Sequence, residues 1–193
     1  MLKSEFIDYW NKEFSETYPI NYELKWVYPD RWFRIHNLPE SKRYAESKSE
    51  YNIILDRQNQ LFNDLFGEGT GIIISFGLFN DCPNISNYKK LFGEFSKVLT
   101  INLKEERPED FFDEDNALFD IYIKTENWKN GKIDVALKVI ANDEIRAMFI
   151  CPSKKCIIAP YDGGVDVIVD NTEKRNRLKR KYRDWLSKRK DGM

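Results

Sequence analysis

Asp162, Asp166 and Asp170 are the carboxylates whose spacing comes closest to a catalytic set. Two acids beside a hairpin turn can bind a divalent cation, as phosphoryl-transfer enzymes require. The segment Asp162-Gly163-Gly164 also has a structural explanation, because a tight turn needs positive φ angles that Gly adopts freely and Asp tolerates. The spacing therefore favours a structural turn. A divalent-metal phosphodiesterase that uses Asp162 and Asp166 is the weaker alternative, and we expect neither a metal ion nor a cofactor.

The other residue types with catalytic potential are isolated in the sequence. The chain has one histidine, His36, and three cysteines, Cys82, Cys151 and Cys156. A structural zinc ion takes four Cys or His ligands, and a nucleophilic Ser or Cys needs a base that a third group orients. The glycine-rich stretch 67–71 lacks the Gly-Lys-Ser/Thr that ends a phosphate-binding loop. We therefore expect a structural histidine, Cys151 facing Cys156 across a hairpin, and no convincing catalytic machinery.

An acidic segment at residues 105–115 holds seven acids and one arginine. Such a run is usually a solvated loop, but here two phenylalanines lie among the acids. Acidic loops with aromatic anchors can occupy a basic cleft on a partner protein. The candidate partner-binding residues are Glu105, Glu106, Glu109, Asp110, Phe111, Phe112, Asp113, Glu114 and Asp115.

A basic segment at residues 174–190 carries ten Lys or Arg and one acid, whereas residues 1–173 carry 21 basic and 30 acidic residues. A helix here can pack Tyr182 and Trp185 on the acidic body, which the helical spacing of its apolar residues favours. It can instead contact nucleic acid, or an acidic membrane surface or protein. The candidate nucleic-acid contacts are Arg175, Lys179, Arg180 and Arg183.

The apolar periodicity predicts helices and short strands in mixed order. One helix carries Phe6, Trp10 and Phe14, and a longer one has a capping box at Ser47 and Glu50 and ends near Gly67. Residues 133–140 fit either a helix or a strand. Further helices are expected at 85–92 and 172–189, and strands at 71–79, 98–103, 118–123, 146–151, 156–159 and 165–169, whereas residues 32–35 suit an irregular or extended stretch. This order predicts an α+β fold: one domain over residues 1–193, a mostly antiparallel sheet flanked by helices, and a basic amphipathic C-terminal helix at about 172–189 packed on the body.

The composition predicts a folded cytoplasmic protein. The chain of 193 residues is 41% hydrophobic and 15% aromatic, which is enough apolar surface for a core. No apolar run approaches the roughly 18 residues of a membrane span, and the acidic N-terminal segment does not match a secretory signal. An odd number of cysteines does not make a disulfide framework.

The C-terminal residues resemble the signature of the bacterial domain-of-unknown-function family numbered 3885. In that family a Tyr-Asp-Asp-Arg-Gly-x-Asp-Val pattern precedes a helix with Tyr and Trp, and here Gly163 stands where Arg is usual. The matching residues are Tyr161, Asp162, Gly164, Asp166, Val167, Tyr182 and Trp185. Residues 31–44 resemble the N-terminal half of the family less specifically. The resemblance implies no transferable enzymatic activity, because members are similar to small intracellular accessory proteins that include immunity proteins.

Two functional hypotheses follow. The first is a non-enzymatic bacterial immunity protein that neutralises a cognate protein toxin through its acidic surface. The alternative is a nucleic-acid-binding accessory protein that uses the basic C-terminal helix.

Overall fold

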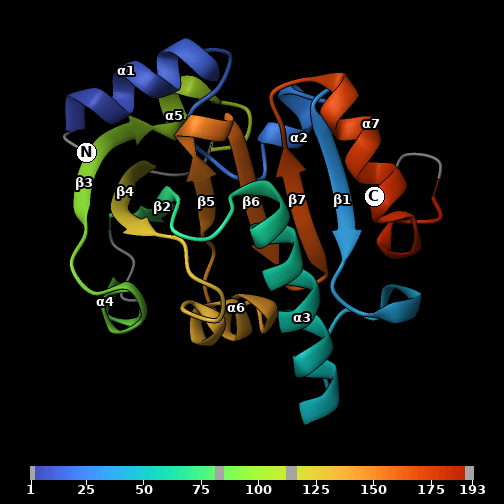
Figure 1. Cartoon of the computed structure of the whole chain (residues 1–193). Coiled ribbons are helices and arrows are strands. Elements are labelled where there is room, and N and C mark those ends of the chain that lie inside the picture. The colour runs from blue at the N-terminus through green and yellow to red at the C-terminus, as the bar shows by residue number, and fades with distance from the viewer. Residues whose placement is uncertain (1–2, 81–84, 112–116, 190–193) are drawn as a thin grey trace.

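The computed structural model describes residues 3–80, 85–111 and 117–189, which form an antiparallel sheet with helices on both faces (Figure 1). The strands are β1 (Trp32–His36), β2 (Gly71–Phe79), β3 (Ser96–Asn102), β4 (Leu118–Asn127), β5 (Met148–Cys151), β6 (Cys156–Tyr161) and β7 (Gly164–Ile168). The helices are α1 (Lys3–Glu13), α2 (Leu24–Val27), α3 (Lys48–Leu65), α4 (Ile85–Phe92), α5 (Leu103–Glu106), α6 (Asp134–Ala141) and α7 (Thr172–Lys181), with 3₁₀ turns η1 (Pro39–Ser41), η2 (Pro152–Lys154) and η3 (Arg183–Trp185). The strand order is β1-β7-β6-β5-β2-β4-β3. The predicted α+β class with a mostly antiparallel sheet is confirmed.

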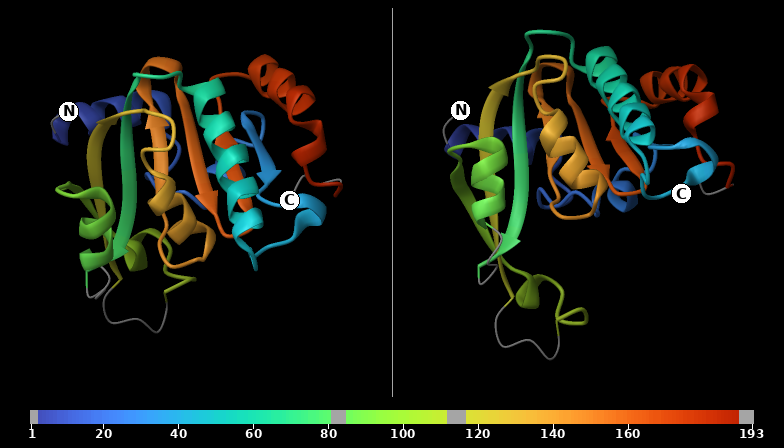
Figure 2. Two further views of the ribbon diagram at one scale, coloured as in Figure 1. Left: turned by 60° about the horizontal axis from the view of Figure 1, so that its bottom comes forward. Right: turned by 90° about the horizontal axis from the view of Figure 1, so that it is seen from below.

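The two faces of the sheet belong to two separate cores. Ile72 and Ile74 of β2 pack with α3, α4 and α6, whereas Ile73 between them packs with α1, α2 and α5. This alternation is the period of two expected for a strand that is buried on both faces. The views in Figure 2 show α3 and α6 on one side of the sheet and α1 on the other.

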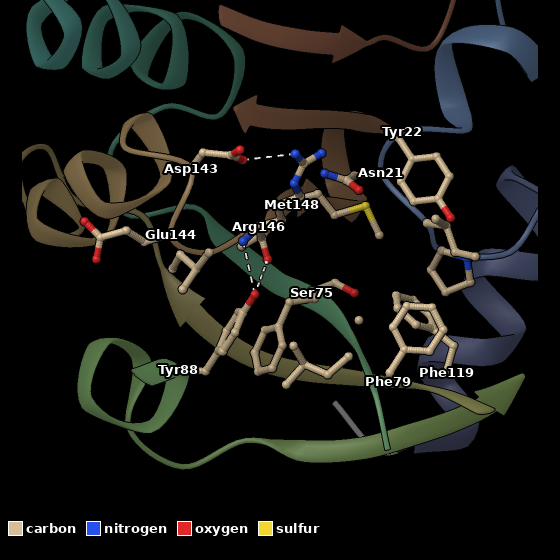
Figure 3. Close-up of a pocket in the computed structure, with 17 residues that line it drawn as sticks. Asn21, Tyr22, Ser75, Phe79, Tyr88, Phe119, Asp143, Glu144, Arg146 and Met148 are labelled. Carbon is tan, nitrogen blue, oxygen red and sulfur yellow. Dashed lines mark hydrogen bonds and ion pairs between the residues drawn. The ribbon is translucent and has the colours of Figure 1, made fainter. Parts of the chain in front are cut away.

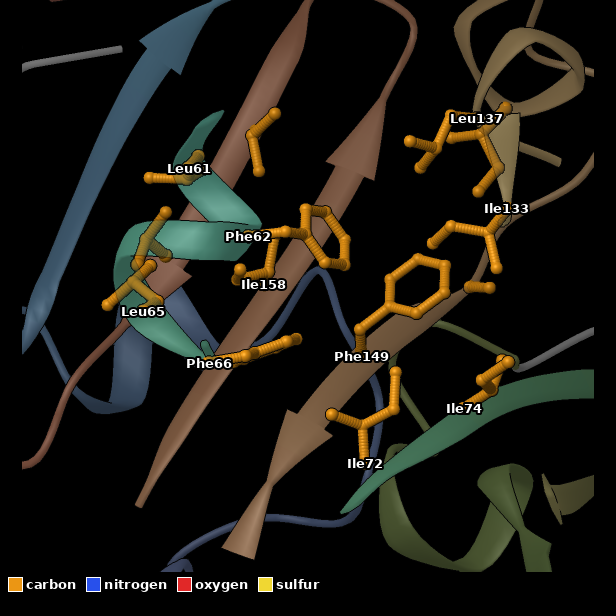
Figure 4. Packing of buried hydrophobic residues seen from close by; sticks show 14 of the residues in the cluster. Leu61, Phe62, Leu65, Phe66, Ile72, Ile74, Ile133, Leu137, Phe149 and Ile158 are labelled. Carbon is orange, nitrogen blue, oxygen red and sulfur yellow. The ribbon is translucent and has the colours of Figure 1, made fainter. Parts of the chain in front are cut away.

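Phe62 of α3 is a central contact of the first core. Its ring stacks on Trp128 with centroids 4.6 Å apart and meets Phe149 of β5 edge-on at 5.0 Å. Figure 4 shows Phe62 and Phe66 directed from α3 toward Phe149 and Ile158 on the sheet. Aromatic pairs of this kind contribute about 0.5–1.5 kcal/mol beyond their buried area, so they fix α3 over β5 and β6.

The two ends of α3 are where the sequence predicts them. The Oγ of Ser47 accepts a hydrogen bond from the backbone N–H of Glu50 at 3.3 Å, and Gly67 follows the helix with a φ of 80°. Both features satisfy backbone groups that a helix end leaves unpaired. No helix of the described residues, α3 included, is long and apolar enough to cross a membrane.

Residues 133–140, which fit either a helix or a strand from sequence, belong largely to the helix α6. Ala136, Leu137 and Ile140 are buried, whereas Val135 is 69% exposed. A strand buried on both faces would have covered Val135 as well. Burial at spacings of one, three and four residues is the pattern of one helix face, and it decides between the two interpretations.

The C-terminal helix is shorter than the predicted span of 172–189. The helix α7 ends at Lys181, and Leu186 has an extended backbone that forms a bridge with Ile35 of β1. Leu178 and Tyr182 are buried in the first core. The helix therefore ends where the chain turns to follow the edge of the sheet.

The glycines of the 162–164 turn have a different purpose from the predicted one. Neither Gly163 nor Gly164 adopts a positive φ angle. A Cβ atom on Gly164 would instead lie far inside the contact distance of the backbone carbonyl oxygen of Ile35. Gly164 thus lets β1 approach β7 closely, which is a packing requirement and not a turn requirement.

We expect the substitution Gly164→Ala to lower the free energy of unfolding by about 1–3 kcal/mol, because β1 cannot retreat without losing its pairing with β7. Gly71→Ala is the matched control: its added Cβ would have its nearest neighbour, Oδ1 of Asn127, at 3.9 Å. The control should change stability by less than about 0.5 kcal/mol. Urea denaturation measures both, and equal effects of the two substitutions would contradict the close approach of β1.

Candidate functional site

The second signature aspartate, Asp166 of β7, forms an ion pair with Arg34, its register partner on β1. The Nε and Nη2 atoms of Arg34 donate to the two carboxylate oxygens at 2.7 and 2.8 Å, and the indole N–H of Trp32 donates a third bond at 2.9 Å. The Arg34 and Asp166 side chains are only 11% and 12% exposed. The guanidinium also lies 4.7 Å from the centre of the Tyr161 ring. Burial raises the pKa of Tyr161 to about 12, so its hydroxyl stays protonated at neutral pH.

The first signature aspartate, Asp162, is buried and accepts a short hydrogen bond from Nε of Arg43. Burial alone would raise the pKa of Asp162, but hydrogen bonds from Arg43 and Tyr44 outweigh it and lower the pKa. The side-chain amide of Asn37 donates to the carbonyl oxygens of Tyr161 and Asp162 at 2.9 and 3.3 Å. These bonds tie the segment after β1 to the turn between β6 and β7.

Both aspartates are thus engaged by arginines from the N-terminal part of the chain. Among the described residues, no group of three or more His, Cys, Asp or Glu side chains is arranged to hold a metal ion. The arrangement joins β1 and the segment after it to the β6–β7 hairpin.

Two aromatic residues of the signature, Tyr182 and Trp185, lie on the opposite face of the sheet, in and against the first core. The hydroxyl of Tyr182 donates to Asp64 of α3, and burial together with this bond raises the pKa of Tyr182. The ring of Trp185 stacks on Tyr182 with centroids 4.9 Å apart. Arg57 of α3 lies 5.2 Å from the Trp185 ring and donates to the carbonyl oxygen of His36 at 2.8 Å. Tyr182 and Trp185 therefore connect the end of the chain to α3 and, through Arg57, to β1.

A family model described as "Domain of unknown function (DUF3885)" matches residues 20–190. The chain belongs to the DUF3885 family. The match includes β1, the β6–β7 turn and α7, so every interaction of the signature residues described above lies within it. Searches of the curated proteins and of the solved structures found no significant match.

The acidic segment of this DUF3885 protein begins within α5, beside the edge strand β3. Its described acids Glu105, Glu106, Glu109 and Asp110 are exposed, and Glu106 accepts a hydrogen bond from the hydroxyl of Tyr18 at 2.9 Å. The predicted contacts Phe112, Asp113, Glu114 and Asp115 lie outside the described residues.

Two contacts hold the described part of the acidic segment on the body. Arg107 forms an ion pair with Glu23, next to α2. The half-buried ring of Phe111 lies 6.2 Å from that of Phe79, at the end of β2. The acids are therefore presented from a position that the body fixes, with aromatic surface beside them.

The basic helix α7 lies at the opposite edge of the sheet, next to β1 (Figure 1). Arg175, one of the predicted nucleic-acid contacts, donates to the carbonyl oxygen of Pro29 at 3.1 Å and so belongs to the body. Lys179, Arg180 and Arg183 are exposed. The acidic and basic segments are thus separated by the full width of the sheet.

The two buried cysteines face each other, as the sequence predicts. Cys151 and Cys156 are register partners across the β5–β6 hairpin, and both are free thiols. Their mutual hydrogen bond lowers the pKa of Cys151 to about 6 and raises that of Cys156.

The histidine, His36, is half-buried at the end of β1, and burial lowers its pKa. Cys82 lies outside the described residues.

A cavity of about 380 Å³ lies beside β2 and was missed by sequence reasoning. Its walls come from β2, residues 19–22 and residues 143–148. Figure 3 shows the hollow between Met148, Ser75, Phe79 and Tyr22. The Oγ of Ser75 is buried here without a hydrogen-bond partner among the described residues. A weak signal exists in the sequence, because Ser75 and Gly77 are small residues within a run of large apolar ones.

The ion pair of Asp162 predicts a pH-dependent contribution to stability. Its folded-state pKa is lowered, so the stabilisation is complete above the ordinary aspartate pKa and is lost as the pH falls through the folded value. We expect Asp162→Asn to cost about 1–3 kcal/mol at neutral pH and progressively less as the pH falls below about 4.

Urea denaturation as a function of pH measures this difference, with Asp110→Asn as an exposed control. The control should change stability by less than about 0.5 kcal/mol. If Asp162→Asn lowers the free energy of unfolding by the same amount down to acid pH, the ionised form of Asp162 does not stabilise the fold.

Proposed function

We propose that this DUF3885 protein is a non-enzymatic bacterial immunity protein of the cytoplasm that binds and neutralises a cognate protein toxin. The observation that carries the proposal is the position of the acidic segment, whose Phe111 lies against Phe79 at the rim of the cavity. A basic surface on the toxin fits this arrangement.

The aromatic rim supplies the apolar part of the proposed contact. Tyr22 and Phe79 are 42% and 40% exposed and line the cavity, and Phe111 and Phe119 both lie against Phe79. Exposed aromatic side chains that a partner can desolvate provide most of the binding energy in many interfaces. The rim therefore supplies affinity where the acids alone would supply mainly charge.

The acids supply orientation and speed of association. Opposite charges on two partners accelerate encounter and exclude partners of the wrong sign. The contacts of Glu106 with Tyr18 and of Arg107 with Glu23 hold the segment against the body before any partner arrives. Less conformational entropy is then lost on binding, which raises the affinity for a given contact area.

We expect the double substitution Glu109→Lys and Asp110→Lys to weaken toxin binding by at least about tenfold, since each change replaces an attraction with a repulsion. The assay uses cells that lack the gene and are complemented with each variant. It measures their survival in co-culture with sibling cells that produce the toxin. The matched control is Asp30→Lys with Asp56→Lys, which changes the net charge equally at exposed positions outside the acidic segment.

The wild type and the control should restore survival, and the acidic-segment variant should not. Survival of the cells without the gene, or equal protection by both variants, would contradict the proposal.

A second candidate function, nucleic-acid binding, is favoured by the exposed side of α7. Arg177, Lys179 and Arg180 are exposed there, and none forms an ion pair with another described residue. Removal of the helix would test this poorly, because it would also remove the buried Leu178 and Tyr182 from the core. Charge reversal of the exposed residues leaves the buried face in place.

If α7 binds nucleic acid, labelled single-stranded RNA should bind with an affinity that falls steeply with salt, and Lys179→Glu with Arg180→Glu should weaken it by at least about tenfold. Fluorescence anisotropy measures the affinity, and thermal unfolding verifies that the variant is folded. An affinity that is independent of salt, or is unchanged in the variant, would exclude α7 as the contact.

A further inference from the structure

Along the edge where it borders the cavity, part of the strand β2 has no partner among the described strands. On its other edge it pairs with β4 over its whole length, from Gly71 to Phe79. Its pairing with β5 covers only residues 73–75, where Ser75 lies opposite Met148. Among the strands that the structure describes, residues 76–79 therefore have a neighbour on one side only.

The register shows which backbone groups face the cavity. The N–H of Asn80 donates to the carbonyl of Leu118, and the N–H of Trp128 donates to the carbonyl of Thr70. Backbone groups along a strand alternate between its two neighbours, so the even-numbered residues of β2 bond toward β4. Gly77 and Phe79 consequently direct their N–H and C=O groups toward the other edge.

The hydroxyl of Tyr88 explains why β5 does not continue along this edge. Extending the β2–β5 register would place Arg146 opposite Gly77. The Tyr88 hydroxyl instead donates to the carbonyl oxygen of Arg146 and accepts from its N–H, both at 3.1 Å (Figure 3). The Tyr88 ring is held in turn by stacking on Phe76, with centroids 4.2 Å apart. The backbone N–H and C=O of Arg146, which would have paired with Gly77, are thus bonded to a side chain instead. The space beside residues 76–79 of β2, here called the gap, is the part of the cavity that β5 leaves unfilled.

The gap is built to receive a ligand with both apolar and polar groups. Its volume of about 380 Å³ lies in the range of pockets that bind ligands, roughly 300–1,000 Å³. Most of the lining is apolar, and Gly77 retains some exposure to solvent. The fully buried Oγ of Ser75, which has no partner among the described residues, lies in the wall of the cavity. A buried hydroxyl without a partner costs about 1–3 kcal/mol, which a bound hydrogen-bonding group would recover.

Acidic residues lie at both ends of the gap, and the Glu144 carboxylate is directed away from the hollow, where it accepts a hydrogen bond from the Asn142 amide (Figure 3). Glu144 lines the cavity on the side of the segment that leads to β5. Glu109 and Asp110 belong to the segment that Phe111 fixes against Phe79, at the far end of β2. Asp143, which also lines the cavity, is neutralised by Arg146 at 3.0 Å. A ligand with positive charge beside its apolar groups is therefore favoured.

We propose that the cavity accepts an extended, lysine- or arginine-containing segment of the partner protein, which adds to β2 as a strand. Backbone groups spaced two residues apart along an open edge are matched by another extended backbone, as in other cases of strand addition. Alternate side chains of the segment enter the cavity, and its basic side chains lie near the acids at the two ends. This inference rests on the proposed function and names the chemistry of the partner at the same site.

The test uses the full chain and a short fluorescein-labelled peptide of alternating lysine and valine with a central phenylalanine. Two substitutions at one position separate backbone from side-chain effects. Phe79→Ala removes the ring and keeps the N–H, whereas Phe79→Pro also removes the N–H that faces the gap. We expect Phe79→Pro to weaken binding at least about tenfold more than Phe79→Ala.

A second measurement does not depend on the folding of any variant. In the wild type, the bound peptide should slow amide hydrogen exchange at Gly77 and Phe79, and N-methylation of alternate peptide nitrogens should abolish this effect. A glutamate–valine peptide should bind at least about tenfold more weakly than the lysine peptide, since its charge opposes the acids.

Equal affinities for Phe79→Pro and Phe79→Ala, unchanged exchange at Gly77 and Phe79, or absence of binding would overturn the strand addition. The survival assay distinguishes this failure from failure of the proposed function. If Phe79→Pro protects cells and the Glu109→Lys, Asp110→Lys variant does not, the partner binds through the acids without adding a strand. If both variants protect as well as the wild type, the proposed function itself is wrong.

Discussion

The ion pair between Arg34 and Asp166 is the interaction on which the placement of β1 depends. Two charges that leave water lose hydration, and their mutual attraction compensates for this loss only when hydrogen bonds satisfy the remaining polar atoms. Asp166 meets this condition because it accepts two bonds from Arg34 and one from Trp32. Loss of one member of such a buried pair typically costs about 3–5 kcal/mol, since the other charge remains in the apolar interior.

Other contacts then fix both ends of β1. Arg31, just before the strand, donates to the carbonyl oxygen of Val169 at 2.6 Å, and Asn37, just after it, bonds to the turn that contains Asp162. Along the edge of β1 that does not pair with β7, Leu186 forms a bridge with Ile35. The C-terminal residues Asp162, Asp166 and Leu186 are thus contact partners of the N-terminal strand β1 and of the segment that follows it. Asp162 and Asp166 are both engaged by arginines of the body.

Local patterns were enough to predict most of the elements, because their signals lie within a few residues of each other. The cap at Ser47, the end of α3 near Gly67 and the facing cysteines of the β5–β6 hairpin are of this kind. The cavity could not be predicted, since its walls come from segments far apart in the sequence, among them Tyr88 of α4, whose hydroxyl bonds to Arg146, 58 residues further along the chain. Likewise the role of Gly164 depends on the backbone of Ile35, so the residues next to Gly164 in the sequence do not indicate it.

The separation of the acidic and basic segments likewise depends partly on local sequence and partly on the arrangement of the strands. The sequence shows that the acidic and basic segments are distinct, but their spatial relation depends on strand order. The acidic segment follows β3 and the basic helix packs beside β1, and these are the two outermost strands. The molecule therefore carries these two charged segments at opposite edges of the sheet, and its field would orient a charged molecule that approaches it.

The pairing of β1 with β7 also bears on how the protein is made. Arg34 and Asp166 are 132 residues apart, so β1 emerges from the ribosome long before its neighbouring strand exists. Contacts of such sequence separation form slowly, and the apolar side chains of β1 remain uncovered while translation proceeds. We expect the nascent chain to need shielding by chaperones until residues 164–186 have left the exit tunnel.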